Sequence, residues 1–539
     1  MTSVPTPHNN RLAFARLRQR LTGRALAGFA LGFMLLLPRP SVAIVGDVPD
    51  VAILLSRYTV AISENGVPKV ARATTTGTVA GAGLTGVFRT WIAGESERTE
   101  QNLGPRSERL LRIHDRIWYA DADGDVREFT GILARRERTQ RFIDSTDFAK
   151  APERCISRGR TLVGGIATYA LDVKAPGGET ETIYLDAVSG LPDRVGYDDD
   201  DGRTTIDFSD WRTVGGHRFP FRTVSSNGDR AYDLVHVTQK VDVASAIDAT
   251  IFAPIVPRRI EMDAPQTLAI EVHEGHAYAP VTIAGHTYTF LLDTGAQHIL
   301  IDKHVATELK LESLGSLEAS GASRTGGLQL TRVHEFRVGE GRLSDIVATT
   351  MDLGASTAGA FRIDGILGYP FFASAIVRLN LAKKTMTFGP PGTLTPVGER
   401  VPLELDRAFP EARFRLNATT EAPFIVDTGN AGEVLLYKPF VDRHPGIVPF
   451  TQHIRHSYGI GGATVSYRTT LDRFETGSAS LFNVDTDVMQ ATRGAFADRF
   501  DAGNVGLGVL KNFNVTFDLA DAAMYLERSD AFDDGRSRK

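Results

Sequence analysis

The second half of this 539-residue chain repeats itself, and the repeat constrains the fold more than any other feature of the sequence. In each copy an apolar segment, Thr287–Leu292 or Ala422–Val426, leads directly into the same tripeptide. The two tripeptides are Asp293-Thr294-Gly295 and Asp427-Thr428-Gly429. A strand-like apolar run that ends in an aspartate and glycine turn is typical of β structure. The sequence therefore predicts two duplicated β lobes, each of which delivers one aspartate.

Matching features recur at similar distances after the two tripeptides. A glycine pair, Gly326-Gly327, follows 33 residues after Asp293, and a second pair, Gly461-Gly462, follows 34 residues after Asp427. Each copy then reaches a short segment rich in glycine, Gly365-Ile366-Leu367-Gly368 or Val505-Gly506-Leu507-Gly508. Isolated turns would not keep this register over units of about 130 residues, so we expect an internal duplication.

The first half of the chain has a different pattern. Short alternating stretches are separated by glycine turns such as Gly177-Gly178 and Gly215-Gly216, and helical periodicity is faint except near the mature N-terminus. This pattern predicts a mainly β fold with a large antiparallel sheet ahead of the two lobes. The expected segments are a signal peptide at 1–43, an antiparallel β domain at 44–255, a linker at 256–266, lobe 1 at 267–392, lobe 2 at 393–530 and a flexible tail at 531–539.

The N-terminus carries the pattern of an export signal. Five arginines between positions 11 and 24 precede an apolar run, Ala25–Leu37, and the small residues Ser41-Val42-Ala43 follow. The apolar run is shorter than the roughly 20 residues that a membrane-spanning helix needs. We therefore expect an exported protein with no stable membrane span after the signal is cleaved.

Charge and cysteine content exclude further classes of protein. Removing residues 1–43 takes away six arginines and no acidic residue, which moves the formal net charge from −5 to −11. An acidic protein is a poor partner for nucleic acid or anionic membranes. The single cysteine, Cys155, rules out an intramolecular disulfide, and we expect it to be a small buried hydrophobe.

Two aspartates delivered by equivalent strands suit the hydrolysis of peptide bonds. Without a metal or a covalent nucleophile, this reaction needs a carboxylate that takes a proton from water and a carboxylic acid that polarises the carbonyl. A close pair of carboxyls meets both needs, because two like charges cannot both ionise cheaply and the pair keeps one proton. We therefore expect Asp293 and Asp427 to be catalytic, with no cofactor and no metal.

The neighbouring residues of each tripeptide would support the two aspartates. We expect Thr294 and Thr428 to hydrogen-bond across the approximate twofold axis and to hold the two loops together. Gly295 and Gly429 would let the two backbones approach closely and place their amide groups beside the carboxylates.

Through these motifs, the segment from about residue 266 to residue 526 resembles the retropepsin and pepsin class of aspartic peptidases. The resemblance implies retropepsin-like lobes that form a pepsin-like pseudo-dimer, a protein or peptide substrate, and a bacterial periplasmic or secreted location. It also implies glycine-rich hairpins, called flaps, that close over the substrate. The residues that match the flaps are Gly326, Gly327, Tyr458, Gly461 and Gly462.

Two further comparisons with this class concern the catalytic loops. In the family an apolar-apolar-glycine segment threads beneath each loop. Ile366-Leu367-Gly368 matches it well, and Gly506-Leu507-Gly508 matches it less well because its first position is glycine. The family also places a serine or threonine two residues after the tripeptide, where its hydroxyl supports the aspartate. This chain has Ala296-Gln297 and Asn430-Ala431 instead. Asn430 or Gln297 could donate in place of the hydroxyl, and the sequence leaves this open.

The N-terminal half carries a looser resemblance. Leu185–Pro192, Asp210-Trp211-Arg212 and Phe219-Pro220-Phe221 together resemble the curved-sheet domains of bacterial lipoprotein carriers. The resemblance implies a concave sheet that could hold an apolar ligand or a peptide. A purely structural module is the alternative.

One motif resembles a zinc site, and two alternatives to a catalytic pair within one chain stay open. His273-Glu274-Gly275-His276 is one residue too short for two zinc ligands on one helix face, so a hairpin turn is expected there. A non-catalytic exported protein that binds a peptide or lipid on the same fold stays open as the alternative function. A pairing of each lobe with another chain also stays open.

Overall fold

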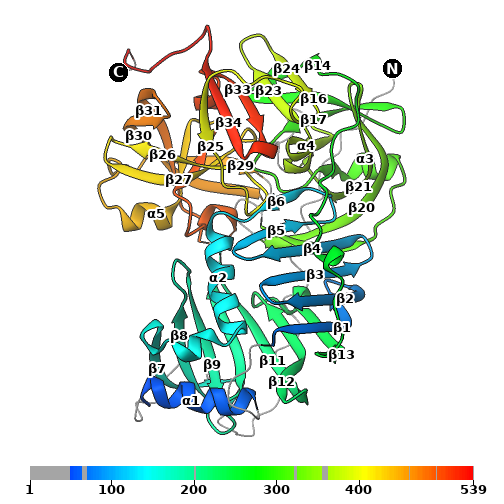
Figure 1. The fold of residues 1–539 in the computed structure, drawn as a ribbon. Helices are drawn as coiled ribbons and strands as arrows, with labels where there is room; N and C mark the ends of the chain where they lie inside the picture. Colours follow the sequence, from blue (N-terminus) through cyan, green and yellow to red (C-terminus); the bar gives the residue numbers. More distant parts are fainter. Residues whose placement is uncertain are drawn as a thin grey trace, which may run out of the picture. The chain divides into compact units, whose positions relative to one another are not determined.

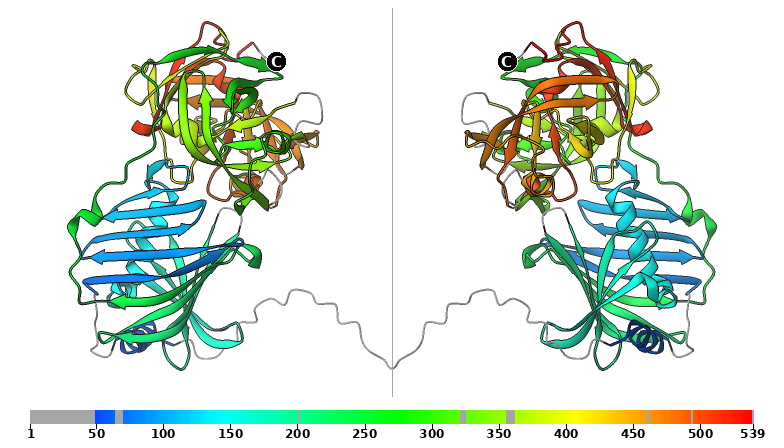
Figure 2. Two further views of the ribbon diagram at one scale, coloured as in Figure 1. Left: turned by 90° about the vertical axis from the view of Figure 1, so that its right-hand side faces the viewer. Right: turned by 90° about the vertical axis from the view of Figure 1, so that its left-hand side faces the viewer.

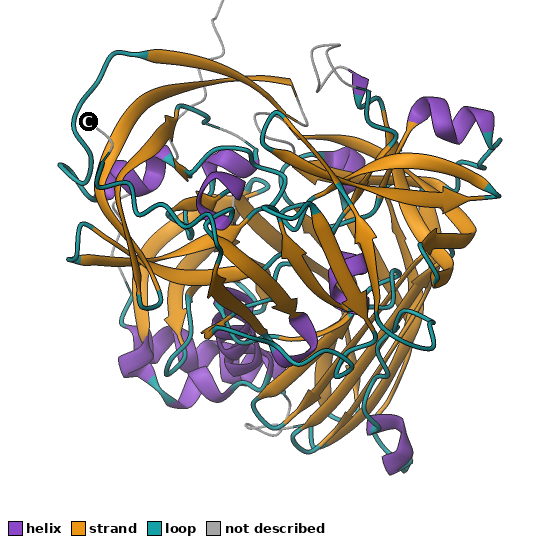
Figure 3. Cartoon of the chain, turned by 90° about the horizontal axis from the view of Figure 1, so that it is seen from above, coloured by secondary structure: helices purple, strands orange, loops and turns teal. Residues whose placement is uncertain are grey.

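The computed structural model describes residues 49–63, 70–199, 202–320, 325–354, 362–459, 462–492 and 494–537. The predicted signal peptide and Gly461 lie outside these ranges. Strands dominate the described residues, and the helices are short (Figure 3). The predicted mainly β fold is therefore confirmed. No helix in these ranges is long and apolar enough to cross a membrane.

The N-terminal domain is built on one antiparallel sheet of thirteen strands. Its first and last strands pair with each other, so the strand order runs outward in both directions from the β1–β13 pair. Figure 2 shows the strong curl of this sheet from two sides. Its strands are β1 (Arg72–Gly81), β2 (Leu84–Ala93), β3 (Ser96–Leu103), β4 (Arg106–Ile113), β5 (Arg116–Ala120), β6 (Val126–Glu128), β7 (Cys155–Val163), β8 (Ile166–Lys174), β9 (Thr180–Asp186), β10 (Pro192–Asp198), β11 (Arg203–Val214), β12 (His217–Ser226) and β13 (Leu234–Asp242).

Two helices, α1 (Val51–Ile62) and α2 (Ile132–Asp144), pack on the same face of this sheet (Figure 1). Leu54 and Tyr58 of α1 share a buried cluster with Ile143 of α2 and with apolar residues of β8 and β9. Cys155 also lies in this cluster, which confirms the expected buried thiol. The helix near the mature N-terminus is expected from the sequence, whereas α2 is not.

The two lobes have sheets with the same strand order. In lobe 1 the order is β15-β16-β17-β22-β18-β21-β20-β19, and lobe 2 repeats it without the first strand as β26-β27-β32-β28-β31-β30-β29. Extra pairings, β16–β20 and β26–β30, close the two sheets in the same way. The strands of lobe 1 are β15 (Glu271–His273), β16 (His276–Ile283), β17 (His286–Leu292), β18 (Leu300–Asp302), β19 (Gly315–Ser320), β20 (Thr325–Val338), β21 (Gly341–Met351) and β22 (Gly365–Leu367). Those of lobe 2 are β26 (Glu411–Leu416), β27 (Thr420–Val426), β28 (Val434–Leu436), β29 (Ile454–Gly459), β30 (Gly462–Thr476), β31 (Ala479–Met489) and β32 (Gly503–Val505).

Short helices follow equivalent strands in the two lobes. They are α3 (Lys303–Glu308) and α4 (Tyr369–Ser374) in lobe 1, and α5 (Lys438–Arg443) and α6 (Leu507–Leu510) in lobe 2. The equivalence extends the duplication from the strands to the connections between them.

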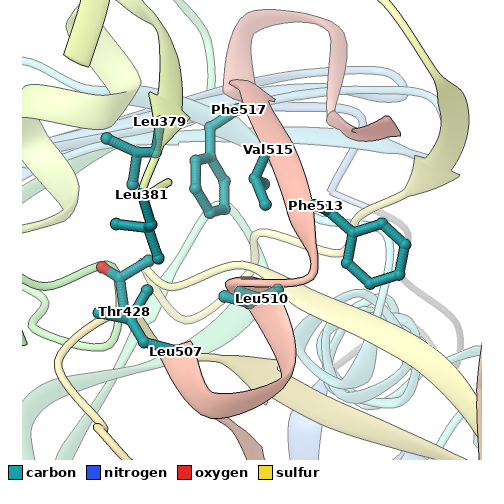
Figure 4. A pocket seen from close by; sticks show the side chains of 8 residues that line it. All are labelled: Leu379, Leu381, Thr428, Leu507, Leu510, Phe513, Val515 and Phe517. Carbon is teal, nitrogen blue, oxygen red and sulfur yellow. The ribbon is translucent and has the colours of Figure 1, made fainter. Parts of the chain in front are cut away.

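A six-stranded sheet joins the two lobes. It contains β14 (Gln266–Ala269), β23 (Ile376–Asn380), β24 (Thr385–Gly389), β25 (Glu399–Pro402), β33 (Phe513–Asp518) and β34 (Ala523–Arg528). Strand β23 of lobe 1 pairs with β33 of lobe 2, so the sheet runs continuously between the lobes. Side chains from β23, β33 and α6 form an apolar pocket that reaches Thr428 (Figure 4). The contact between the two lobes is thus apolar, and it extends to Thr428 of the second Asp-Thr-Gly tripeptide.

Candidate active site

Equivalent parallel strand pairs deliver the two aspartates. Strand β17 pairs with β22 and β27 pairs with β32, and the aspartate follows the last residue of β17 or β27. The backbone N–H of Asp293 donates to the carbonyl of Leu367 at 3.2 Å, and the N–H of Asp427 donates to that of Val505 at 2.9 Å. Each aspartate loop is therefore fixed by a neighbouring buried strand of its own lobe.

The two threonines lock the loops to each other. The backbone N–H of Thr294 donates to the hydroxyl of Thr428 at 3.0 Å, and the N–H of Thr428 donates to the hydroxyl of Thr294 at 3.0 Å. Each hydroxyl also donates across to the opposite lobe, to the carbonyl of Val426 at 2.6 Å or that of Leu292 at 2.9 Å. Both threonines are fully buried. Four reciprocal hydrogen bonds thus hold the two loops together across the approximate twofold axis.

The two carboxyls meet at this axis and hydrogen-bond to each other. The N–H groups of Gly295 and Gly429 donate to the Oδ1 atoms of Asp293 and Asp427, each at 2.9 Å. Each glycine also faces the carboxyl of the opposite lobe, and a Cβ on Gly295 would lie 2.8 Å from the Asp427 carboxyl carbon. A side chain at either glycine would push the carboxyls apart.

The environment favours a single shared proton. Burial raises the pKa of both carboxyls, and repulsion raises further the pKa of whichever carboxyl ionises second. Backbone N–H groups act in the opposite direction and lower the pKa of each aspartate. Because negative charges on two neighbouring carboxyls repel each other strongly, the pair loses its protons in two separate steps.

Support for Asp427 comes from a residue that the sequence analysis does not identify. The side-chain Nδ2 of Asn504 donates to Oδ2 of Asp427 at 2.8 Å. The side chain of Asn430 does not donate to the aspartate; its Nδ2 donates to Oδ1 of Asn504 at 2.7 Å instead. In lobe 1, Gln297 also bonds elsewhere, to the backbone carbonyl of Arg407 at 2.5 Å. In the part of the chain that the structure describes, a side-chain donor thus takes the place of the expected hydroxyl at Asp427, and none does so at Asp293.

The register of the loops corrects one sequence match. The expectation that Gly506-Leu507-Gly508 is the apolar-apolar-glycine segment of lobe 2 is wrong by two residues. The equivalent of Ile366-Leu367-Gly368 is Asn504-Val505-Gly506, because Ile366 pairs with Leu291 and Asn504 pairs with Ile425, each two residues before its aspartate. A polar residue at the first position hides this match in the sequence.

The residues matched to flaps lie on hairpins. Gly326 and Gly327 belong to β20 and pair with Ala319 and Glu318 of β19. Tyr458 and Gly462 lie on the equivalent β29–β30 hairpin, where Gly459 pairs with Gly462. The loop of each hairpin and Gly461 fall outside the described residues.

The N-terminal domain contacts the segment that follows Asp293 in lobe 1. Nδ1 of His298 lies 3.2 Å from Oδ2 of Asp123, and this carboxylate raises the pKa of the imidazole although burial lowers it. The carboxylate of Asp406, at the entry to lobe 2, accepts hydrogen bonds from backbone N–H groups of Gly131 and Leu133 at the start of α2, at 2.9 Å in both cases. The domain is therefore attached to lobe 1 just after the Asp293 loop and to lobe 2 just before β26.

The segment that resembles a zinc motif, His273–His276, forms a turn in the structure. His273 pairs with His276 at the β15–β16 turn, which confirms the expected hairpin. Across the described ranges, no group of three or more His, Cys, Asp or Glu residues is arranged to hold a metal ion.

Comparisons with known proteins agree with the geometry of lobe 1. A family model described as aspartyl protease matches residues 279–371, from β16 through Asp293 to α4. No curated protein matches the chain.

Three solved structures resemble part of the chain with a TM-score of 0.27 each. They are a domain described as an outer membrane lipoprotein-sorting protein from Vibrio parahaemolyticus (10% identity, 37% of this chain, 95% of that chain), a DUF1329 family protein from Desulfovibrio piger (15%, 38% and 97%) and a LolA superfamily protein from Nitrosomonas europaea (11%, 38% and 97%). Similarity at this level identifies neither a ligand nor a function for this chain.

Proposed function

We propose that this chain is an exported aspartic endopeptidase that acts in the periplasm or outside the cell. It would hydrolyse peptide bonds of its substrate by activating a water molecule between the carboxyls of Asp293 and Asp427. One observation carries the proposal: two half-buried carboxyls from duplicated loops hydrogen-bond to each other, and each accepts a backbone N–H from its own loop. The family match at residues 279–371 supports the same chemistry for lobe 1. The export proposal depends on the sequence of residues 1–43.

In the proposed reaction the ionised carboxyl takes a proton from water, and the water oxygen bonds to the carbonyl carbon of the substrate. The protonated carboxyl gives its proton to the carbonyl oxygen, which produces a neutral gem-diol. The carbon–nitrogen bond then breaks as the first carboxyl passes its proton to the leaving nitrogen. A diol hydroxyl returns a proton to the second carboxyl, so the pair regains its single proton.

The surroundings suit a peptide substrate. The β19–β20 hairpin carries Gly326 and Gly327, and the β29–β30 hairpin carries Gly459 and Gly462. Glycine has no side chain, so another backbone can approach it closely. We propose that an extended peptide lies beneath these hairpins and across the two carboxyls. A protein that binds a peptide or an apolar ligand without cleaving it is the alternative.

Digestion of an unfolded protein over a range of pH tests the proposal. We expect an optimum on the acid side of neutrality and inhibition by a statine-type compound, while chelators leave the cleavage unchanged. Asp293→Asn and Asp427→Asn should each lower the rate by about 10²–10⁴-fold or more, because each removes one partner of the proton transfers. Asp345→Asn, at an exposed carboxylate of lobe 1, is the matched control and should cleave like the wild type.

Full activity in either dyad variant would remove that aspartate from the mechanism. A wild type that co-purifies with a ligand and never turns over a peptide would favour the binding protein. Sedimentation of the active form separates the pairing within one chain from pairing between chains, because an active monomer excludes the latter.

A further inference from the structure

We propose that Asn504 is a positioning residue of the catalytic pair, which donates to Oδ2 of Asp427 and so favours the negative charge on Asp427 rather than on Asp293. The inference rests on the proposed function and assigns different roles to the two aspartates. Asp427 would be the base that takes the proton from water, and Asp293 would be the acid that protonates the carbonyl oxygen.

The geometry makes the two carboxyls unequal. Asp427 accepts from Gly429 at Oδ1 and from Asn504 at Oδ2, whereas Asp293 accepts from Gly295 at Oδ1. Among the residues that the structure describes, no amide or hydroxyl side chain donates to Asp293. A hydrogen bond donated to a carboxylate stabilises its ionised form. The extra donor therefore lowers the cost of placing the charge on Asp427 and opposes the effect of repulsion on that residue.

A second side chain fixes the orientation of Asn504. Nδ2 of Asn430 donates to Oδ1 of Asn504, so the amide group of Asn504 must turn its Nδ2 toward Asp427. Oδ1 of Asn430 in turn accepts the backbone N–H of Gly432 at 2.8 Å, which fixes Asn430. Asn504 is only 2% exposed, so few solvent molecules compete for its donor. The bond from Asn430 therefore decides which atom of the Asn504 amide faces Asp427, and that atom is the Nδ2 donor.

The duplication supplies an internal comparison. The position of lobe 1 that is equivalent to Asn504 is Ile366, which is buried in an apolar cluster with Leu291 and Ala296. An apolar side chain thus satisfies the packing of this position in one lobe. The amide in the other lobe is not required by the fold, which points to a role in the chemistry.

Other titratable groups also face Asp427. They are Asp293 from the opposite loop, Tyr437 at the start of α5, and His276 of β16, whose ring bonds to the backbone of Gly429. None of these groups changes when Asn504 is replaced. A difference between wild type and an Asn504 variant therefore isolates the amide donor.

The test is the pH dependence of kcat/KM for a fluorogenic peptide in wild type, Asn504→Leu and Asn504→Asp. We expect the acid limb of the profile to move to higher pH by about one unit in Asn504→Leu, since one charge-assisted hydrogen bond is lost, and by more in Asn504→Asp, which adds a like charge. Asn430→Ala should give a smaller shift in the same direction. Ile366→Leu is the packing control and should leave both limbs in place.

A second readout does not need turnover. Because the folded pair in Asn504→Leu binds its proton more tightly, the deficit in Tm relative to wild type should grow as pH rises through the acid limb. A constant deficit at every pH, an unmoved acid limb, or a shift confined to the alkaline limb would each overturn the inference. An inactive wild type would overturn the proposed function instead, and the Tm series would still decide the role of Asn504.

Discussion

Replacement of Thr428 by valine tests whether the reciprocal hydrogen bonds hold the two lobes together. Valine has nearly the same shape, so the change removes the hydroxyl and little else. The backbone N–H of Thr294 and the carbonyl of Leu292 then lose their partners at a fully buried site. Each unpaired buried group costs about 1–3 kcal/mol, so we expect the free energy of unfolding to fall by about 2–5 kcal/mol.

A serine at the same position separates the two parts of the side chain. Thr428→Ser keeps the hydroxyl and removes the methyl group, at a residue that lines the apolar pocket between the lobes (Figure 4). One buried methyl group contributes about 1 kcal/mol, so serine should be much less damaging than valine. Thr287→Val, on an exposed position of β17, is the control and should change stability by less than about 0.5 kcal/mol.

Calorimetry of the mature chain measures the effect, with circular dichroism as a second probe of the lobes. All three tryptophans lie in the N-terminal sheet, so their fluorescence reports on that domain and not on the lobes. We expect the transition of the lobes to fall by roughly 5–15 °C in Thr428→Val. A valine variant within about 1 kcal/mol of wild type, or a serine variant as unstable as valine, would refute the reasoning.

Two further predictions concern the N-terminal domain. Asp406→Ala should destabilise α2 by about 1–2 kcal/mol, because the Asp406 carboxylate caps the first N–H groups of the helix. Tryptophan fluorescence during unfolding in denaturant measures this loss. Asp406→Asn should recover part of it, because the amide oxygen can still accept a hydrogen bond. Burial, with like charge from Asp144 and Glu137, raises the pKa of Glu181 from 4.5 to about 8, so Glu181 contributes stability that is fully present below pH 4.5 and lost as pH rises toward 8. Glu181→Gln should therefore lose less stability than wild type across this interval, and parallel curves of stability against pH for the two proteins would contradict the assignment.

Local sequence patterns could not predict α2 because its signals are not local. The helix has a polar, arginine-rich sequence, and its N-cap, Gly131, offers no side chain to the first N–H groups. The cap comes from Asp406, which lies 273 residues away from Leu133 in the sequence. A helix that is capped and packed by distant residues gives neither a capping motif nor a clear apolar stripe. The strands were predictable because alternation and glycine turns are properties of adjacent residues.

The same distinction explains which parts of the candidate site could be predicted. Asp293 and Asp427 occupy the same position in a repeat that can be read directly from the sequence. A duplicated strand and turn predict two similar lobes related by an approximate twofold axis. Asn504 belongs to a three-residue strand, and only the parallel pairing of β27 with β32 carries it to Asp427, 77 residues earlier. A search for a side-chain donor next to the tripeptide therefore finds Asn430, whose amide side chain acts on Asp427 through Asn504.

The asymmetry between the lobes follows from how duplication works. Once a duplicated fold has a common axis, the backbone contacts must stay equivalent, because each threonine bonds to the opposite loop and neither loop can change alone. The side chains that surround each aspartate have no such constraint. Ile366 and Asn504 occupy equivalent positions with opposite polarity, and Gln297 and Asn430 have different partners. Two identical carboxyls can also share one proton, so only the departures from symmetry around the pair can distinguish its acid from its base.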